Sequence, residues 1–223
     1  YYYIPDNWSD EIFENNVRQE YNLSVSGASD KMNYYMSAGY LDDQGIVPNS
    51  GFQRYSARLK ADYQVKPWLK LGANVSFTHY DSREQDTEGG TSNANIFYAS
   101  NIMGAIYPMY IRDAQGNIMT DNRGFQRYDY GKKGQDTNGS RNTIPNANPL
   151  ASYMLDKMKY SGDVVSGKWF ADVDIWGGIK AKVNIGVDAN NVRNTDMVNP
   201  FYGQYSETTG VGGLISVSTQ RTF

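Results

Sequence analysis

Long runs in which polar and apolar residues alternate constrain the fold of this chain more than any other feature of its sequence. In residues 54–63 the odd positions are Tyr55, Ala57, Leu59, Ala61 and Tyr63, and the even positions are Arg54, Ser56, Arg58, Lys60 and Asp62. Successive side chains of a β-strand point to opposite faces. The run therefore predicts a strand with one apolar face and one strongly polar face.

The same alternation recurs along the chain and predicts about seven strands. Beside residues 54–63 it is present at 21–26, 33–40, 69–78, 169–175 and 179–189, and a last strand begins near Leu214 and continues to Phe223. The apolar faces are rich in Ala, whereas the opposite faces hold charges of both signs. A sandwich core needs larger interlocking side chains, but a lipid-facing surface needs only to be apolar. The pattern favours a transmembrane β-barrel over a soluble β-sandwich.

The connections between the predicted strands are alternately short and long. The short ones are 27–33, 65–67 and 176–178, and the long ones are 42–51, 81–165 and 190–213. Outer-membrane barrels have short periplasmic turns and long extracellular loops, and their strands need ~9–11 residues to cross the bilayer. Aromatic residues near the expected strand ends would form an interfacial girdle; they are Tyr63, Trp68, Tyr80, Trp169 and Trp176.

We therefore expect an all-β antiparallel meander of about seven strands, a segment of a large transmembrane β-barrel with one long extracellular loop that carries a short helix. The expected division is a loop or the end of a preceding element at 1–18, four strands at 19–80, the long extracellular loop at 81–165, two strands at 166–189, a loop at 190–213 and the start of the next strand at 214–223.

Local motifs predict some structure within the long loop. Residues 111–118 are expected to form a small hairpin in which Gly116 supplies a positive φ. Asn148 followed by Pro149 is typical of a helix N-cap and first position. A short helix should follow from Pro149 to about Lys159, with an apolar face made of Leu150, Tyr153, Met154 and Met158. Residues 86–95 are polar and Gly-rich, and we expect them to be mobile.

Composition excludes several classes of function. The net charge of -3 argues against nucleic-acid binding, because no basic patch is present to neutralise phosphates. The absence of Cys excludes a disulfide framework and thiolate metal sites. No stretch is long and apolar enough for a transmembrane helix. The N-terminus lacks the features of a signal peptide, so we expect a mature chain or a piece of a longer one.

Several motifs, taken in order, resemble the early to middle barrel of SusC/RagA-type TonB-dependent transporters. The matching stretches are 22–27, 33–40, 44–47, 52–56, 68–74, 106–108, 113–117, 148–151 and 199–203. Examples are Gln44-Gly45-Ile46-Val47 and Asn148-Pro149-Leu150-Ala151. Each motif alone is weak, but their shared order extends the resemblance over nearly the whole chain.

The resemblance implies a barrel of about 22 strands with a plugged lumen. It implies import of oligosaccharides or peptides across the outer membrane of a Gram-negative bacterium, driven by TonB, with a SusD-like lipoprotein at the extracellular mouth. The expected partners are outer-membrane lipid, the remainder of the barrel and its plug domain. We identify no plug domain or TonB box here, so TonB would be reached through a missing N-terminal part. About seven strands cannot enclose such a lumen, and a complete eight-stranded barrel ending at Phe223 would need one more strand.

No residues in the sequence form a convincing catalytic or metal site, and we predict no enzyme activity, no metal and no cofactor. His79 is the only histidine and is expected to be an interfacial polar residue rather than a catalyst. Asp172 and Asp174 share a strand face and resemble an acid/base pair, but we interpret them as lumen-facing polar residues. Residues 42–45 resemble part of a calcium loop but lack its further spaced ligands, so a turn is favoured.

Aromatic residues of the long loop are the candidate ligand or partner contacts. They are Phe97, Tyr98, Tyr107, Tyr110, Tyr128 and Tyr130. Such side chains stack on sugar rings, dock a partner or pack the loop on itself, and packing is favoured. They also define the alternative function, a soluble carbohydrate-binding β-sandwich that uses its aromatic loops. A glycan-degrading enzyme has the least support, because no paired carboxylates converge.

Overall fold

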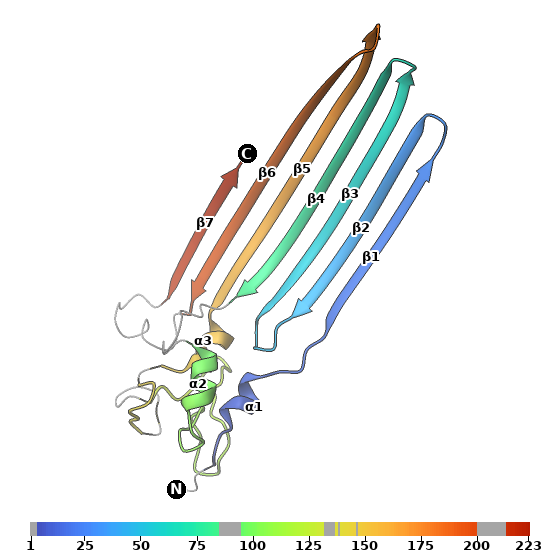
Figure 1. Cartoon of the computed structure of the whole chain (residues 1–223). Helices are drawn as coiled ribbons and strands as arrows, with labels where there is room; N and C mark the ends of the chain where they lie inside the picture. Colours follow the sequence, from blue (N-terminus) through green and yellow to red (C-terminus); the bar gives the residue numbers. More distant parts are fainter. Residues whose placement is uncertain (1–3, 85–94, 132–136, 138, 146, 200–212) are drawn as a thin grey trace.

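The computed structural model consists of one long antiparallel sheet with a group of short helices and loops at one end (Figure 1). It describes residues 4–84, 95–131, 137, 139–145, 147–199 and 213–223. The strands are β1 (Arg18–Ala28), β2 (Met32–Gln44), β3 (Gly51–Lys66), β4 (Leu69–Glu84), β5 (Lys157–Trp176), β6 (Ile179–Val198) and β7 (Leu214–Thr222), and each pairs only with its neighbours in sequence order. The predicted meander of about seven strands is confirmed.

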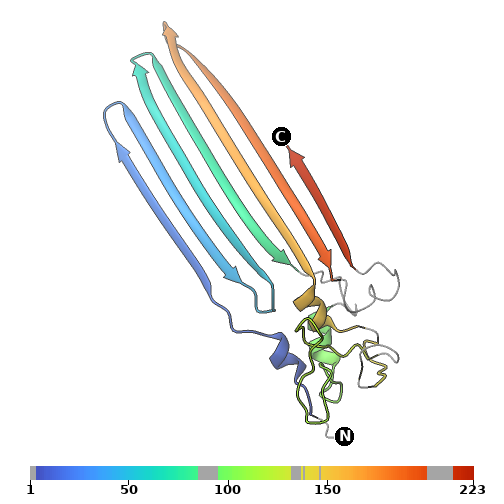
Figure 2. The same cartoon turned by 180° about the vertical axis from the view of Figure 1, so that it is seen from behind.

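The sheet is a single layer. The view from behind shows neither face covered by a second sheet or a helix within the described ranges (Figure 2). Tyr55, Leu59 and Tyr63 remain 49%, 45% and 47% exposed, so they are not the core of a sandwich. The soluble β-sandwich alternative is therefore wrong. None of the helices in the described part of the chain is long and apolar enough to cross a membrane.

Two-residue turns close the hairpins at the end of the sheet opposite the helices. Trp176 pairs with Ile179 across Gly177 and Gly178, whose φ angles are 61° and 85°. Positive φ at both central residues is the geometry of a type I′ turn, which matches the twist of the flanking strands and favours Gly. The turn between β3 and β4 is equally short, and Ser29 closes the turn from β1 to β2 by bonding to Met32.

Three strands extend furthest beyond their predicted ends. β4 continues to Glu84, β5 begins at Lys157 rather than 166, and β6 continues to Val198 rather than ending at 189. The register runs without interruption from Val165↔Ala189 to Lys157↔Met197. Both faces are mostly polar in this stretch, so period two disappears from the sequence although the backbone ladder continues.

The connections and the third helix also differ from their predicted bounds. The connection expected at 42–51 is only residues 45–50, where Gly45 N–H donates to Ser50 and Asn49 has a φ of 58°. α3 (Pro149–Leu155) has the predicted Asn148 cap but ends four residues before Lys159. Met158 therefore lies in β5 and not on the helix. The expected mobile stretch at 86–95 lies, except for Asn95, outside the described residues.

Three glycines make room for aromatic rings on neighbouring strands. A Cβ on Gly72 would lie 2.0 Å from the Phe170 ring, one on Gly162 would lie 2.3 Å from Tyr80, and one on Gly27 would lie 2.5 Å from Tyr34. In each case the glycine and the aromatic residue are direct cross-strand partners. The rings thus lie across the backbone instead of projecting from the sheet.

The helices and loops beyond the sheet form a compact unit, which we call the loop subdomain. It comprises the described residues of 4–13, 95–131, 139–145 and 147–155, with α1 (Trp8–Ile12), α2 (Ile96–Ile102) and α3. Its buried core is Trp8, Ile12, Ile96, Ala99, Met103, Met109, Tyr110, Tyr128, Tyr130, Ile144, Leu150, Ala151 and Tyr153, and Val47 from the connection between β2 and β3 packs into it. Side-chain caps begin α1 and α2, because Asn7 accepts from Ser9 N–H and Asn95 accepts from Tyr98 N–H.

Candidate functional site

One face of the sheet carries a continuous apolar band. The strand registers align its members in rows, such as Val25↔Met36, Met36↔Leu59 and Leu59↔Val75. On β5 and β6 the band extends from Val165 to Ile175 and from Ile179 to Ala189. We call this face the outer face. Large exposed apolar patches mark surfaces that meet a partner or a membrane, and this one covers the sheet from edge to edge.

Small residues leave a depression in the outer face near the short turns. Ala61, Ala73 and Ala171 line a depression of about 450 Å³ between the larger side chains Tyr63 and Trp169. Its walls are almost entirely apolar. Such a surface would be poorly packed against another protein layer, but fluid lipid tails can follow it.

Aromatic rings mark the boundary of the outer face at the loop end. Tyr21 and Tyr40 have ring centroids 6.4 Å apart, and Tyr40 and Tyr55 have centroids 5.0 Å apart. This row fits the interfacial position that amphipathic rings prefer. The girdle expected from the sequence was partly misplaced, because Trp169 lies in the middle of β5 and Tyr80 belongs to the opposite face. Trp68 and Trp176 do lie at the short turns.

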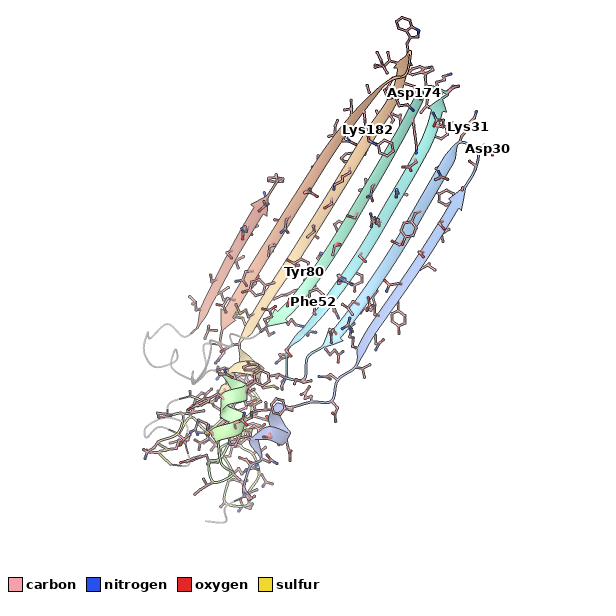
Figure 3. All side chains as sticks on the ribbon, viewed as in Figure 1. Asp30, Lys31, Phe52, Tyr80, Asp174 and Lys182 are labelled. Carbon is pink, nitrogen blue, oxygen red and sulfur yellow. The ribbon has the colours of Figure 1, made fainter. Side chains whose placement is uncertain are left out.

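The opposite face, which we call the inner face, is polar and carries cross-strand ion pairs. Lys182 Nζ lies 3.4 Å from Asp172 and Lys180 Nζ lies 3.2 Å from Asp174. These pairs are near the short turns, as the positions of Asp174 and Lys182 show (Figure 3). Two lysine ammonium groups, Lys70 and Lys182, also lie 5.8 and 5.0 Å from the centroid of the Phe170 ring.

The inner face is thus built for contact with polar groups rather than for acid/base chemistry. Asp172 and Asp174 each have a lysine partner, as expected of structural polar residues. At the loop end of the same face Phe52 and Tyr80 stack with centroids 6.0 Å apart (Figure 3). Within the described ranges no group of three His, Asp or Glu side chains is placed to hold a metal ion.

His79 lies on the outer face, just past the apolar band. Its Nδ1 is 2.7 Å from Asp163 Oδ1, and its Nε2 is 3.9 Å from Asp81 Oδ2. Tyr55 packs beside the imidazole with ring centroids 6.4 Å apart. The geometry places His79 at the edge of the band, where the sequence predicted an interfacial polar residue.

The loop subdomain buries most of the six aromatic residues proposed as contacts. Tyr110, Tyr128 and Tyr130 are in its core, and Tyr98 and Tyr107 pack partly buried against that core. Burial raises the pKa of Tyr110 and raises that of Tyr128 to about 12, with the Glu11 carboxylate contributing to both shifts. Only Phe97 is exposed, at 42%, and its ring lies 5.9 Å from that of Phe13. Five of the six therefore have a packing role.

The N-terminal segment closes the loop subdomain through contacts that are distant in sequence. Asp6 accepts from Met109 N–H at 2.6 Å and pairs with Arg112 at 2.6 Å. The Trp8 indole donates to the Tyr107 carbonyl at 3.0 Å. Sequence reasoning missed this docking, because nothing near residues 6–8 indicates a partner about a hundred residues away.

A buried ion pair and a buried amide organise the interior of the loop subdomain. Arg141 Nη1 lies 3.1 Å from Asp129 Oδ1, with 2% and 0% of the two side chains exposed. Burial lowers the pKa of the Arg141 guanidinium, and the Asp129 carboxylate opposes that shift. The Asn148 amide donates to the carbonyls of Met109 and Asp129, while its oxygen caps α3. These bonds satisfy polar groups that water cannot reach.

Two consecutive hairpins of the loop subdomain are closed by the same kind of turn, in which an Asp side chain accepts from backbone N–H groups two and four residues later. Asp113 accepts from Gln115 N–H and Asn117 N–H, and Gly116 has a φ of 90°. Hydrogen bonds to Asn117 lower the pKa of the Asp113 carboxyl. Asp121 and Gly124 repeat the arrangement eight residues later. The hairpin at 111–118 is confirmed, and the repeated Asp-x-x-Gly spacing was the signal for the second.

The relatives found by comparison with known proteins are TonB-dependent receptors. No family model matches the chain. TonB-dependent receptor P3 of Formosa agariphila is 24% identical over 96% of this chain and 19% of its own length. TonB-dependent receptor SusC of Bacteroides thetaiotaomicron is 33% identical over 39% of this chain and 9% of its own length. The chain therefore spans at most about a fifth of these relatives.

Solved structures agree in fold. The RagAB peptide importer in its open-open state superposes with a TM-score of 0.67 at 24% identity, covering 88% of this chain and 20% of that one. A second structure, the RagAB peptide transporter, covers 96% of this chain with a TM-score of 0.65 at 22% identity.

The single sheet with one apolar and one polar face is a wall segment of an outer-membrane β-barrel. More specifically, the chain matches in sequence and fold a segment of the SusC/RagA-type TonB-dependent receptors, which are outer-membrane proteins of Gram-negative bacteria. The prediction that it is not an enzyme agrees with this family of transporters.

Proposed function

We propose that the protein containing this segment imports oligosaccharides or peptides across the outer membrane, driven by TonB and assisted by a SusD-like surface lipoprotein. The observation that carries the proposal is the likeness of nearly the whole sheet and its loops to the RagAB importer, together with the alignment to SusC-type receptors. In this arrangement the segment provides part of the barrel wall and part of the extracellular mouth.

Each surface of the segment then has a distinct task. The outer face would contact lipid, since its apolar band is continuous and unfilled by protein. The inner face would contact the plug and the water of the lumen through its ion pairs and the Phe170 ring. The edges β1 and β7 would pair with further strands, because unpaired backbone groups are not tolerated in a bilayer.

The loop subdomain would stand on the extracellular side and face the lipoprotein or the cargo. Its solvent-facing aromatic pair, Phe13 and Phe97, is the best contact candidate that it offers. An exposed pair of rings fits a sugar face or an apolar side chain of a peptide or partner. Peptide and glycan cargo remain equal candidates for this receptor.

Uptake by the full-length receptor tests the proposal. A strain that depends on this receptor should take up labelled oligosaccharide or peptide only while TonB is present. Phe97→Ala should reduce uptake several-fold with normal receptor levels, whereas Asn101→Ala on the same helix is the matched control. Uptake that continues without TonB would refute the transport mechanism.

Cysteine labelling tests the orientation, because the segment itself contains no Cys. Asn101→Cys in the loop subdomain should react with a membrane-impermeant maleimide on intact cells. Asp30→Cys at a short turn should react only after the outer membrane is opened. The reverse labelling pattern would place the loop subdomain in the periplasm.

A further inference from the structure

Most cations on the inner face are neutralised by carboxylates of the same sheet. Pairs of opposite charge on one face stabilise a sheet, whereas like charges side by side destabilise it. The side-chain nitrogens of the paired cations lie 3.2 to 3.8 Å from a carboxylate oxygen. These cations are Arg18, Arg54, Lys70, Lys180 and Lys182. A cation without such a partner is therefore unusual on this face.

Three neighbouring cations in the middle of the inner face are the exception. Arg58, Lys60 and Lys168 are exposed, and no carboxylate of the described residues lies within ion-pair distance of them. Arg58 and Lys60 are successive inner-face residues of β3. Lys60 and Lys168 flank Asn74 on one row of the register. We call Arg58, Lys60, Asn74 and Lys168 the basic cradle.

The basic cradle borders a depression of about 460 Å³ in the inner face. A volume of this order is typical of a small-molecule site. The Phe170 ring forms an apolar wall of the depression, because it lies across the backbone of Gly72. The depression adjoins the row that contains Lys182, which Figure 3 labels near the short turns. Its inner-face lining is Lys60, Asn74, Lys168 and Gly186 on one row and Asp62, Phe170 and Asn184 on the next.

The groups that the basic cradle offers to a ligand are hydrogen-bond donors. Arg58 Nε donates to Asn74 Oδ1 at 3.0 Å, which leaves the amide nitrogen of Asn74 as a further donor. The ammonium groups of Lys60 and Lys168 donate only. Two strand spacings separate the backbones of these lysines by about 10 Å, a gap that two flexible four-carbon side chains can span. Donors without acceptors fit an anion, and a carboxylate accepts several such bonds at once.

The carboxylates nearest the basic cradle do not cancel its charge. Asp62 lines the depression but pairs with Lys70 at 3.8 Å, and Asp172 pairs with Lys182 at 3.4 Å. Asp188 is exposed and lies one row further toward the loops. Together with the cradle, five cations on these rows face three carboxylates. This part of the inner face is therefore net positive.

We propose that the basic cradle binds a carboxylate of the cargo as the cargo passes along the inner face. The inference rests on the proposed function, because only an importer brings cargo to this face. Basic side chains that line a pore select anions by the same electrostatic attraction. An open depression with exposed ammonium groups suits a ligand that must leave again. The cargo is therefore acidic, either a peptide with acidic side chains or an oligosaccharide that contains uronic acid.

Binding by the purified full-length receptor tests the site. The receptor in a neutral detergent would be titrated in a calorimeter with trigalacturonate, with its methyl ester, with a glutamate-containing peptide whose ends are blocked, and with the same peptide carrying glutamine. At least one acidic probe should bind, and its neutral counterpart should bind on the order of tenfold more weakly. Added salt should weaken only the acidic probe. The acidic probe that binds tells glycan cargo from peptide cargo.

Matched variants separate the basic cradle from general effects of charge. Lys60→Gln with Lys168→Gln should weaken binding of the acidic probe on the order of tenfold, because each exposed ion pair is individually weak. Lys60→Arg with Lys168→Arg keeps the charge and should retain most of the binding. Lys31→Gln with Lys157→Gln removes the same charge from a short turn and from the outer face, and should leave binding unchanged. Heat-modifiable migration on a gel would verify that each barrel is folded.

Three results would overturn the site. Equal binding of an acidic probe and its neutral counterpart would remove the role of the carboxylate. Unchanged binding in the glutamine variant of the cradle, or equal loss in the control variant, would place the acidic probe elsewhere. A wild-type receptor that binds neither acidic probe would have a cradle closed to cargo, as it would be with a carboxylate of the plug seated there. Uptake that continues without TonB, while probe binding follows the prediction, would count against the importer proposal alone.

Discussion

The sheet and the loop subdomain solve the problem of burial in opposite ways. The sheet keeps Leu23, Leu59 and Ile185 at 70%, 45% and 60% exposed and has no core of its own. The loop subdomain buries Trp8, Ile12 and Ile96 almost completely. A barrel wall uses the bilayer in place of a core, whereas the loop subdomain, in water, must build one from residues collected along the chain.

The largest expected effect is on the buried ion pair of the loop subdomain. Arg141→Met should destabilise this unit by about 3–5 kcal/mol, because it leaves Asp129 buried without its partner. Limited proteolysis should then cleave the loops while the barrel keeps its heat-modifiable migration. Adding Asp129→Leu should recover much of the loss. Barrel unfolding in the single variant would mean that the two regions are not independent.

A charge placed in the apolar band tests whether the outer face of the sheet meets lipid. Leu59→Arg should destabilise the folded barrel by about 2–4 kcal/mol, since the side chain would face the bilayer midplane. Ser24→Arg on the inner face is the matched control and should have little effect. Urea titration in lipid vesicles measures both. Equal effects at the two positions would contradict the assignment of the faces.

Asn148 offers a smaller change in the loop subdomain. Asn148→Ala removes the cap of α3 and two hydrogen bonds to buried carbonyls, which should reduce stability by about 1–3 kcal/mol. Hydrogen exchange of the α3 amides would report the loss, with Phe97→Ala as a neutral comparison. Unchanged exchange would show that water replaces the lost bonds.

The smallest effect at neutral pH comes from Tyr128. Burial raises its pKa to about 12, above the ordinary value of about 10. The folded state thus holds this proton more tightly, so its contribution to stability is complete below about pH 10 and is lost as the pH rises towards the folded value. Tyrosinate absorbance should show Tyr128 titrating late, and Tyr128→Phe should remove that late component. Titration with the ordinary pKa would show that Tyr128 is open to water.

The sequence predicted the sheet far better than the loop subdomain. Alternation at residues 55–63 defined the correct faces, because lipid and lumen differ in polarity and the strand has a period of two. Asn148 followed by Pro149 identified a helix start, because caps are local. The ends of β5 and β6 were missed, since polar residues cover both faces there, such as Arg193 on one face and Asn194 on the other. The pairing of Asp129 with Arg141 and the docking of Trp8 depend on tertiary contacts without a local signal.

The continuation of β5 and β6 past the apolar band also affects how a partner would meet the receptor. Seven residues of β5, from Met158 to Val164, are paired with a strand on both sides at the loop end of the sheet. At ~3.4 Å per residue they form a rigid extension roughly 24 Å long. Loops held by such a rigid extension lose little conformational entropy when a second protein docks on them. The entropy cost of ordering them is incurred once, during folding, and not at each binding event.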